Sequence, residues 1–298
     1  MPTADDPRKG AVLLVGAAFW FSLMSVLVKT AGRLLPVEML ILARGVISLG
    51  LSYAVLRRLG LSPWGHDKKR LLLRGLFGLG GLASLFFAFT QLPLAEVTVI
   101  HYLNPLLTSL LAAIFLGERV TGRLLIALLV SMAGTLLVVR PSWLWSQSAS
   151  THPPLGYMAA FVGAIFSACA YVTVRRLRLT DDANVIIFYF PLIAVPASLP
   201  FAVASWTWPT PTGWLLLLAI GCVTQLGQIF LTRGLALMPA GQGTAIGYIQ
   251  IAFAATWGWL FFDEAVSAPT IAGAALIIGS TVVVSRLGRS LQPKLSRT

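Results

Sequence analysis

The sequence predicts an all-α integral membrane protein of ten transmembrane helices, arranged as two inverted five-helix repeats. The first observation behind this prediction is composition. Of the 298 residues, 57% are hydrophobic and only 11% are charged, and the mean hydropathy is +0.84. A soluble domain does not contain so many apolar stretches of about 20 residues, the length that spans ~30 Å of hydrocarbon.

Ten such stretches follow one another, each bounded by charged residues, Pro or Gly. We expect helices over 10–29, 36–56, 71–91, 94–116, 122–139, 155–176, 183–204, 213–235, 240–262 and 269–287.

The second observation is that the chain matches itself without a gap at an offset of 146 residues. Gly10 aligns with Gly156, Tyr102 with Tyr248 and Glu118 with Glu264. Each half holds five spans, an odd number, so the second half enters the membrane from the opposite side. We predict a first repeat over 10–140, a linker over 141–154 and a second repeat over 155–287. Inverted repeats are typical of secondary transporters.

The third observation is the uneven distribution of the net charge of +12. If the N-terminus is inside, one side receives 18 of the 22 basic residues, Arg74 and Arg175 among them. The other side receives Lys29, Arg33 and Arg140. Such an excess marks the cytoplasmic side. We therefore expect a multi-pass inner-membrane protein with both termini in the cytoplasm, whose basic residues contact lipid headgroups and not nucleic acid.

Motifs of enzyme chemistry are absent from the sequence. There is no phosphate-binding G-x-x-x-x-G-K-[ST] loop, no HExxH and no CxxC, and Cys169 and Cys222 fall in different spans. The glycines of Gly75–Gly81 are typical of close helix packing. We expect no enzyme activity, no cofactor and no metal, and a monomer that suffices for transport.

The segment Leu103–Pro141 resembles the closing motif of an EamA domain of the drug/metabolite transporter superfamily. Its marks are Pro105, Gly117-Glu118 and Gly134, and the second half repeats them more loosely with Glu264, Gly273 and Gly279. The second half departs from the motif at Ile251 and Asp263, so the halves need not be equivalent. Within the superfamily the chain is most similar to the YddG-type exporters of aromatic amino acids. The resemblance implies a central cavity between the halves and alternating access.

Polar residues within the spans indicate where such a site lies, because polar groups in hydrocarbon normally face protein or a cavity. In the fourth span Thr98, His101 and Tyr102 share one helix face, and Tyr248 lies on the matching face of the ninth. Asn104 and Gln250 are a matched amide pair that could bind cargo or cap backbone freed by Pro105. His101 could hydrogen-bond cargo, carry a coupling proton or be structural.

Other spans add candidates for the same site. Gln225 and Gln228 belong to a polar stripe of the eighth span, Ser22 lies in the first and Tyr171 in the sixth. Trp20, Phe87 and Trp257 could form aromatic walls. For each of these, ordinary helix packing or interhelical hydrogen bonding is the alternative. Arg44 lies inside the second span, where we expect an ion pair or a side chain that reaches the interface.

The cargo predicted from these residues is a small zwitterion, an aromatic or other large neutral amino acid. The spans have no Asp or Glu near their centres, which disfavours the alternative of a lipophilic-cation or multidrug exporter. A channel is a further alternative, but channels usually build their pathway around a multimer axis. We expect the two halves to rock about a site where Tyr102 faces Tyr248, with a bend at Pro105 that the ninth span lacks at Ile251.

The predicted topology can be tested with reporter fusions. A reporter placed after Leu61 and one placed after Trp145 are expected on opposite sides of the membrane. The same side for both would contradict the ten-span arrangement.

Overall fold

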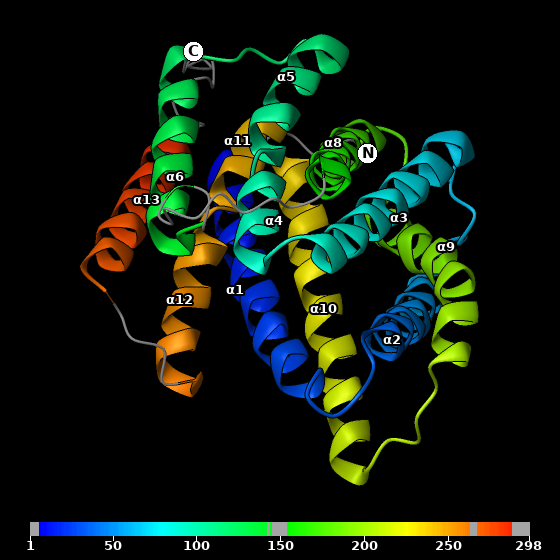
Figure 1. Ribbon diagram of the computed structural model, residues 1–298. Coiled ribbons are helices and arrows are strands. Elements are labelled where there is room, and N and C mark those ends of the chain that lie inside the picture. Colours follow the sequence, from blue (N-terminus) through cyan, green and yellow to red (C-terminus); the bar gives the residue numbers. More distant parts are fainter. Residues whose placement is uncertain (1–5, 142–143, 145–153, 263–266, 288–298) are drawn as a thin grey trace.

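The computed structural model describes residues 6–141, 144, 154–262 and 267–287 (Figure 1), and within these residues it contains helices and no strand. In the first half the helices are α1 (Pro7–Ala31), α2 (Val37–Arg58), α3 (Lys68–Gln91), α4 (Leu94–His101), α5 (Asn104–Leu116) and α6 (Gly122–Val139). In the second half they are α8 (Pro154–Leu177), α9 (Ala183–Ala204), α10 (Pro211–Leu237), α11 (Ala240–Ile246), α12 (Ile249–Phe262) and α13 (Ala268–Leu287).

These elements make 10 helical segments long and apolar enough to cross a membrane. The fourth consists of α4 and α5 and the ninth of α11 and α12, so the ten predicted spans are confirmed. Most of the expected linker, as well as Asp263 and Glu264, lies outside the described residues.

Helices of the two repeats are interleaved. The most extensive contacts join α1 with α10, α3 with α8, α6 with α13 and α2 with α9, and each pair combines one helix from either half. The expectation that the two halves rock as separate five-helix bodies is therefore wrong. The contacts distinguish two mixed bundles instead, α1, α10, α11 and α12 in one and α3, α4, α5 and α8 in the other, while the pair α2–α9 contacts both, α2 through α10 and α9 through α3.

Both the fourth and the ninth span are interrupted at equivalent residues. Pro105 has no N–H to donate to the carbonyl of His101, and the side-chain amide of Asn104 donates to that oxygen instead, at 2.9 Å. In the ninth span α11 ends at Ile246 and α12 begins at Ile249. The expectation that the ninth span lacks a break was wrong, because it is interrupted at Gly247 and Tyr248, which align with His101 and Tyr102 at the offset of 146, although Ile251 stands where the fourth span has Pro105.

Glycine packing brings helices of the two halves together, as predicted for Gly75–Gly81. A Cβ at Gly80 would meet Phe166, and one at Gly81 would meet Ser167. Between α6 and α13 the backbones themselves approach: a Cβ at Gly134 would lie 2.7 Å from the carbonyl oxygen of Gly273, and one at Gly273 would lie 2.5 Å from that of Gly134. The hydroxyls of Ser131 and Ser280 lie 2.6 Å apart in the same interface.

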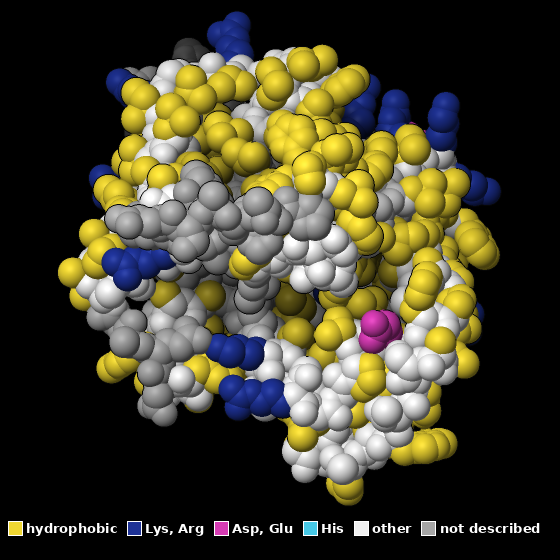
Figure 2. Space-filling view, in the orientation of Figure 1, with side chains coloured by type: hydrophobic (Ala, Val, Ile, Leu, Met, Phe, Trp, Pro, Cys, Tyr) yellow, Lys and Arg dark blue, Asp and Glu magenta, His cyan; other side chains and the backbone are white. Residues whose placement is uncertain are grey.

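The end of the molecule that carries residues 59–67, 117–121 and 178–182 is called the basic end below. Figure 2 shows Lys and Arg side chains mainly along the upper edge, where the α5–α6 connection lies in Figure 1, and hydrophobic side chains over much of the rest of this face. A hydrophobic flank is what contact with lipid requires.

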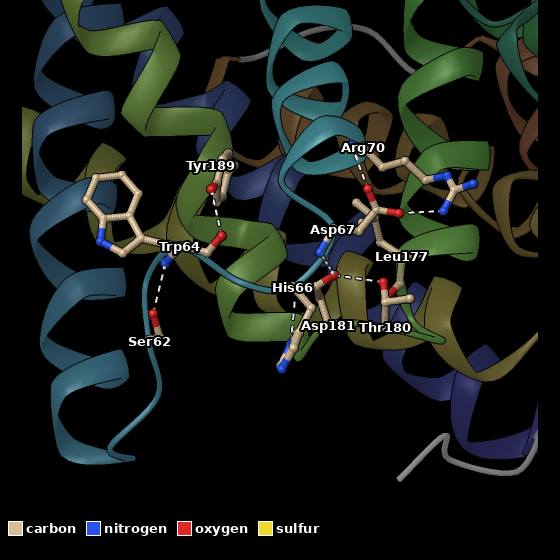
Figure 3. Close-up of polar contacts among 9 residues, drawn as sticks. All are labelled: Ser62, Trp64, His66, Asp67, Arg70, Leu177, Thr180, Asp181 and Tyr189. Carbon is tan, nitrogen blue, oxygen red and sulfur yellow. Dashed lines mark hydrogen bonds and ion pairs between the residues drawn. The ribbon is translucent and has the colours of Figure 1, made fainter.

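At the basic end, the loop between α2 and α3 is hydrogen-bonded to the turn between α8 and α9 (Figure 3). The Asp181 carboxylate accepts hydrogen bonds from the backbone N–H groups of His66 and Asp67 and from the Thr180 hydroxyl. The Tyr189 hydroxyl donates to the carbonyl of Trp64 at 2.9 Å. These bonds fix the start of α3 against the second repeat.

The α6–α13 contact leads to a stability prediction. Gly134→Ala should lower the free energy of unfolding by about 1–3 kcal/mol, because the added methyl meets backbone that has no room to move. Gly279→Ala, also in this helix pair, is the control, since nothing lies within 4 Å of its added Cβ. Thermal unfolding in detergent measures both, and equal midpoints would contradict the assigned contact.

Candidate functional site

The two interrupted spans meet at a pair of tyrosines. The rings of Tyr102 and Tyr248 lie with their centroids 5.5 Å apart and their planes at 31°. The Tyr248 hydroxyl donates to the carbonyl oxygen of Tyr102 at 2.6 Å, so a group at one break satisfies backbone at the other. Tyr248 is 0% exposed. The expected facing arrangement is present, and the centre is filled by protein side chains in this conformation.

His101 and Asn104 flank the break in the fourth span. The Nδ1 atom of His101 is buried without a hydrogen-bond partner among the described residues, and its ring lies 6.4 Å from that of Tyr102. The amide of Asn104 caps the freed carbonyl of His101, the structural alternative of the two considered. Its matched partner Gln250, in the first turn of α12, is half-buried.

The two threonines of these faces differ in burial. Thr98 is half-buried, whereas Thr244 is buried and donates to the carbonyl of Ala240 at 3.0 Å within its own helix. The hydroxyl proton of Thr244 is therefore already engaged.

An aromatic cluster joins α1 to α12. The Trp257 indole donates to the Ser22 hydroxyl at 2.9 Å, and the ring of Phe19 lies 5.4 Å from Trp20 and 5.9 Å from Trp257. Ser22 is 0% exposed. Three predicted residues are thus brought together, Ser22 and Trp257 in direct contact with each other. Phe87 is 42% exposed on α3, apart from this cluster.

Not all polar side chains of the α10 stripe lie near the two tyrosines. The Gln225 amide donates to the Ser52 hydroxyl at 2.8 Å, in the interface of α10 with the peripheral helix α2. Placing Gln225 in a central cavity was therefore wrong, because its position on α10 turns it toward α2. Gln228, three residues further on, is half-buried.

Arg74 is a residue that sequence reasoning placed at the cytoplasmic surface, and this was wrong. Its side chain is 3% exposed, within α3. Helix α3 packs against α8, whose Tyr171 side chain contacts the same core cluster as Tyr102. The sequence contained a signal of this burial. Arg74 lies inside the third span, which was expected to begin at Leu71, whereas Lys68–Arg70 precede that span.

A second polar cluster closes the basic end. The Glu118 carboxylate accepts from Arg175 Nε at 3.0 Å and from the backbone N–H of Ala240 at 2.7 Å. Arg175 and Arg178 both donate to the carbonyl of Ala236, at 3.1 and 2.8 Å. Glu118 follows α5, whereas its partners come from α8 and α11. This carboxylate, the Glu118 tie, links the two mixed bundles at that end.

A surface hollow of about 440 Å³ lies away from the tyrosines, lined by residues 32–36, 207, 208 and 210, at the end opposite the basic end. The described residues contain no group of three His, Cys, Asp or Glu side chains that could hold a metal ion. The centre offers hydroxyl, amide and imidazole groups.

Comparison with known proteins identifies the family. The EamA-like transporter family matches residues 8–140 and 154–286. The chain is 36% identical to the pseudopaline exporter CntI of Pseudomonas aeruginosa, over 95% of this chain and 98% of that protein. It is 30% identical to solute carrier family 35 member G1 of Mus musculus, over 93% of this chain and 78% of that protein.

A solved crystal structure has the same fold. It aligns with a TM-score of 0.81 at 20% identity, over 94% of this chain and 98% of that one. The two repeats, the interleaved helices and these matches agree, and the chain belongs to the EamA-like transporter family.

Proposed function

We propose that this membrane transporter exports a small zwitterionic metabolite, an aromatic or other large neutral amino acid, by alternating access at the Tyr102–Tyr248 centre. The observation that carries the proposal is the meeting of two broken helices at two stacked tyrosines. Irregular backbone at membrane depth is tolerated only inside protein or beside a cavity, and transporters use such breaks as binding sites.

The break supplies groups that fit a zwitterion. The N-termini of α5 and α12 begin at Asn104 and Ile249, and helix N-termini favour a negatively charged group such as a carboxylate. His101 Nδ1 and the tyrosine hydroxyls offer neutral hydrogen-bonding atoms, and the tyrosine rings offer an apolar surface for a side chain.

The contacts at the two levels support the proposal of alternating access. The Glu118 tie closes the basic end while the tyrosines fill the centre. Cargo requires the tyrosines to separate, and passage to the cytoplasm requires the tie to break. We propose that the two mixed bundles move against each other for these steps.

A second candidate cargo is pseudopaline, favoured by one observation. The relative whose name states that it exports pseudopaline shares 36% identity over 95% of this chain. A lipophilic cation is a poorer fit, because the carboxylates of Glu118 and Asp181 are held by other groups near the basic end.

The cargo proposal is tested by counterflow in proteoliposomes with amino acids, pseudopaline, nucleotide sugars and lipophilic cations. Aromatic amino acids are expected to exchange. Tyr102→Ala and Tyr248→Ala should weaken cargo binding about 5- to 150-fold, by loss of a polar contact worth ~1–3 kcal/mol. Tyr53→Ala on α2, where the side chain is 47% exposed, is the control. Transport of nucleotide sugars or cations without amino acids or pseudopaline would contradict the proposal.

The closing of the basic end has its own test. In a Cys169→Ala, Cys222→Ala background, Ser109→Cys reports opening, because Ser109 is 4% exposed and packs against Gly241 of α11. Glu118→Gln should raise the rate at which maleimide labels the cysteine introduced by Ser109→Cys about 5- to 30-fold. This is the effect expected if the substitution lowers the stability of the closed state by about 1–2 kcal/mol. Asp67→Asn, which breaks the local pair with Arg70, should leave the rate unchanged. Equal rates for Glu118→Gln and the parent would show that the tie does not hold this end closed.

A further inference from the structure

Arg74 is a positive charge inside the protein without a negative partner. Its side chain is 3% exposed, and its Nε and Nη1 atoms are buried without a hydrogen-bond partner in the described part of the chain. A buried charge is ordinarily paired, since removal from water is costly. The guanidinium therefore has unused donors of the kind that bind carboxylate in a bidentate manner.

The direction of the side chain excludes a simple surface role. Arg74 lies six residues into α3, about 9 Å from its start at the basic end. A Cβ added to Gly78, one turn further from that end, would lie 2.7 Å from Arg74 Nη1. The guanidinium thus extends toward the middle of the membrane, opposite to an arginine that reaches for lipid headgroups. Gly78 leaves the room that this direction needs.

The surroundings of Arg74 favour an anion. The guanidinium packs over the ring of Phe190 of α9, 5.6 Å from its centroid, and Arg44 of α2 lies 5.8 Å from the same centroid. Neither arginine has an ion-pair partner among the described residues, so the ion pair expected for Arg44 is not found there.

Carboxylates elsewhere in the protein are engaged by other groups. Glu118 is bonded to Arg175, Asp181 to the loop before α3, and Glu96 to the Tyr157 hydroxyl at 2.7 Å. The guanidinium groups of Arg74 and Arg44, which both lie at the Phe190 ring, therefore lack negatively charged partners among the described residues.

Tyr171 connects Arg74 to the centre. Tyr171 belongs to α8, which packs against α3, the helix of Arg74, and its side chain contacts the same core cluster as Tyr102. We propose that Arg74, with the Tyr171 hydroxyl, binds the carboxylate of the transported metabolite at one side of the central site. This inference rests on the proposed transport function and adds that the cargo is a carboxylate. Gly78 and Phe190 then act as positioning residues for the guanidinium.

The first test compares benzoate with benzamide, which has the same ring but no charge, as stabilisers of the purified full-length protein. Benzoate should raise the thermal unfolding midpoint more than benzamide does. Arg74→Gln should weaken benzoate binding about 10- to 150-fold and remove the difference. Arg74→Lys should keep part of it, since lysine retains charge but not the bidentate fork. Arg70→Gln, one turn earlier and paired with Asp67, is the matched control and should behave as wild type.

A structural role for Arg74 is distinguished without any ligand. Arg74→Met should leave the unfolding midpoint of the ligand-free protein equal or higher, because it removes an unpaired buried charge. A clear loss of stability in Arg74→Met, the absence of a benzoate preference in the wild type, or its persistence in Arg74→Gln would each overturn the proposal. Stabilisation by phosphatidylglycerol that Arg74→Gln abolishes, with none by benzoate, would assign the guanidinium to a lipid phosphate and also overturn it.

The outcome is separable from that of the cargo proposal. If liposomes move no amino acid but benzoate still binds through Arg74, the anion site stands and the amino acid cargo fails. If amino acids are transported equally by wild type and Arg74→Gln, the cargo stands and the anion site fails.

Discussion

The hydrogen bond from the Tyr248 hydroxyl to the Tyr102 carbonyl joins the two points where membrane-spanning helices are interrupted. Hydrocarbon offers no water to an interrupted backbone, so the groups freed at each break must find partners inside the protein. Asn104 supplies one such partner locally, and Tyr248 supplies another from the opposite repeat. Both breaks are consequently held at the interface of the two repeats.

That constraint also explains why the halves are interleaved. The strongest contacts pair α1 with α10 and α3 with α8, which are equivalent pairs under the repeat. Glycines permit this closeness, as at Gly134 and Gly273, where a single methyl group would meet backbone. In the proposed transport cycle, motion therefore separates the mixed bundles and not the two halves of the sequence. The Tyr102–Tyr248 contact and the Glu118 tie lie on the boundary between these bundles.

Carboxylates and the two arginines at the Phe190 ring lie at different depths in the protein. Carboxylates lie toward the helix ends and have several donors each, as Glu118 and Asp181 show. Arg74 and Arg44 lie deeper and share only an aromatic ring. A cation–π contact offsets part of the desolvation of a guanidinium but leaves its hydrogen-bond donors unused. Among the described residues, the interior has unpaired positive charge, and the carboxylates of Glu96, Glu118 and Asp181 are engaged, which disfavours cationic cargo and agrees with the proposed binding of a carboxylate metabolite.

The sequence by itself determined the number of spans, the inverted repeat and the pairing of Tyr102 with Tyr248. These depend on hydropathy over about 20 residues and on a fixed offset, both of which are local or additive properties of the chain. It did not determine which neighbour each polar side chain meets. Gln225 turns toward Ser52, Gly247 breaks a span without proline, and Arg74 bends past Gly78 into the protein. Only the tertiary structure decided these, because the rotation of each helix about its axis and the space left by a glycine depend on helices distant in sequence.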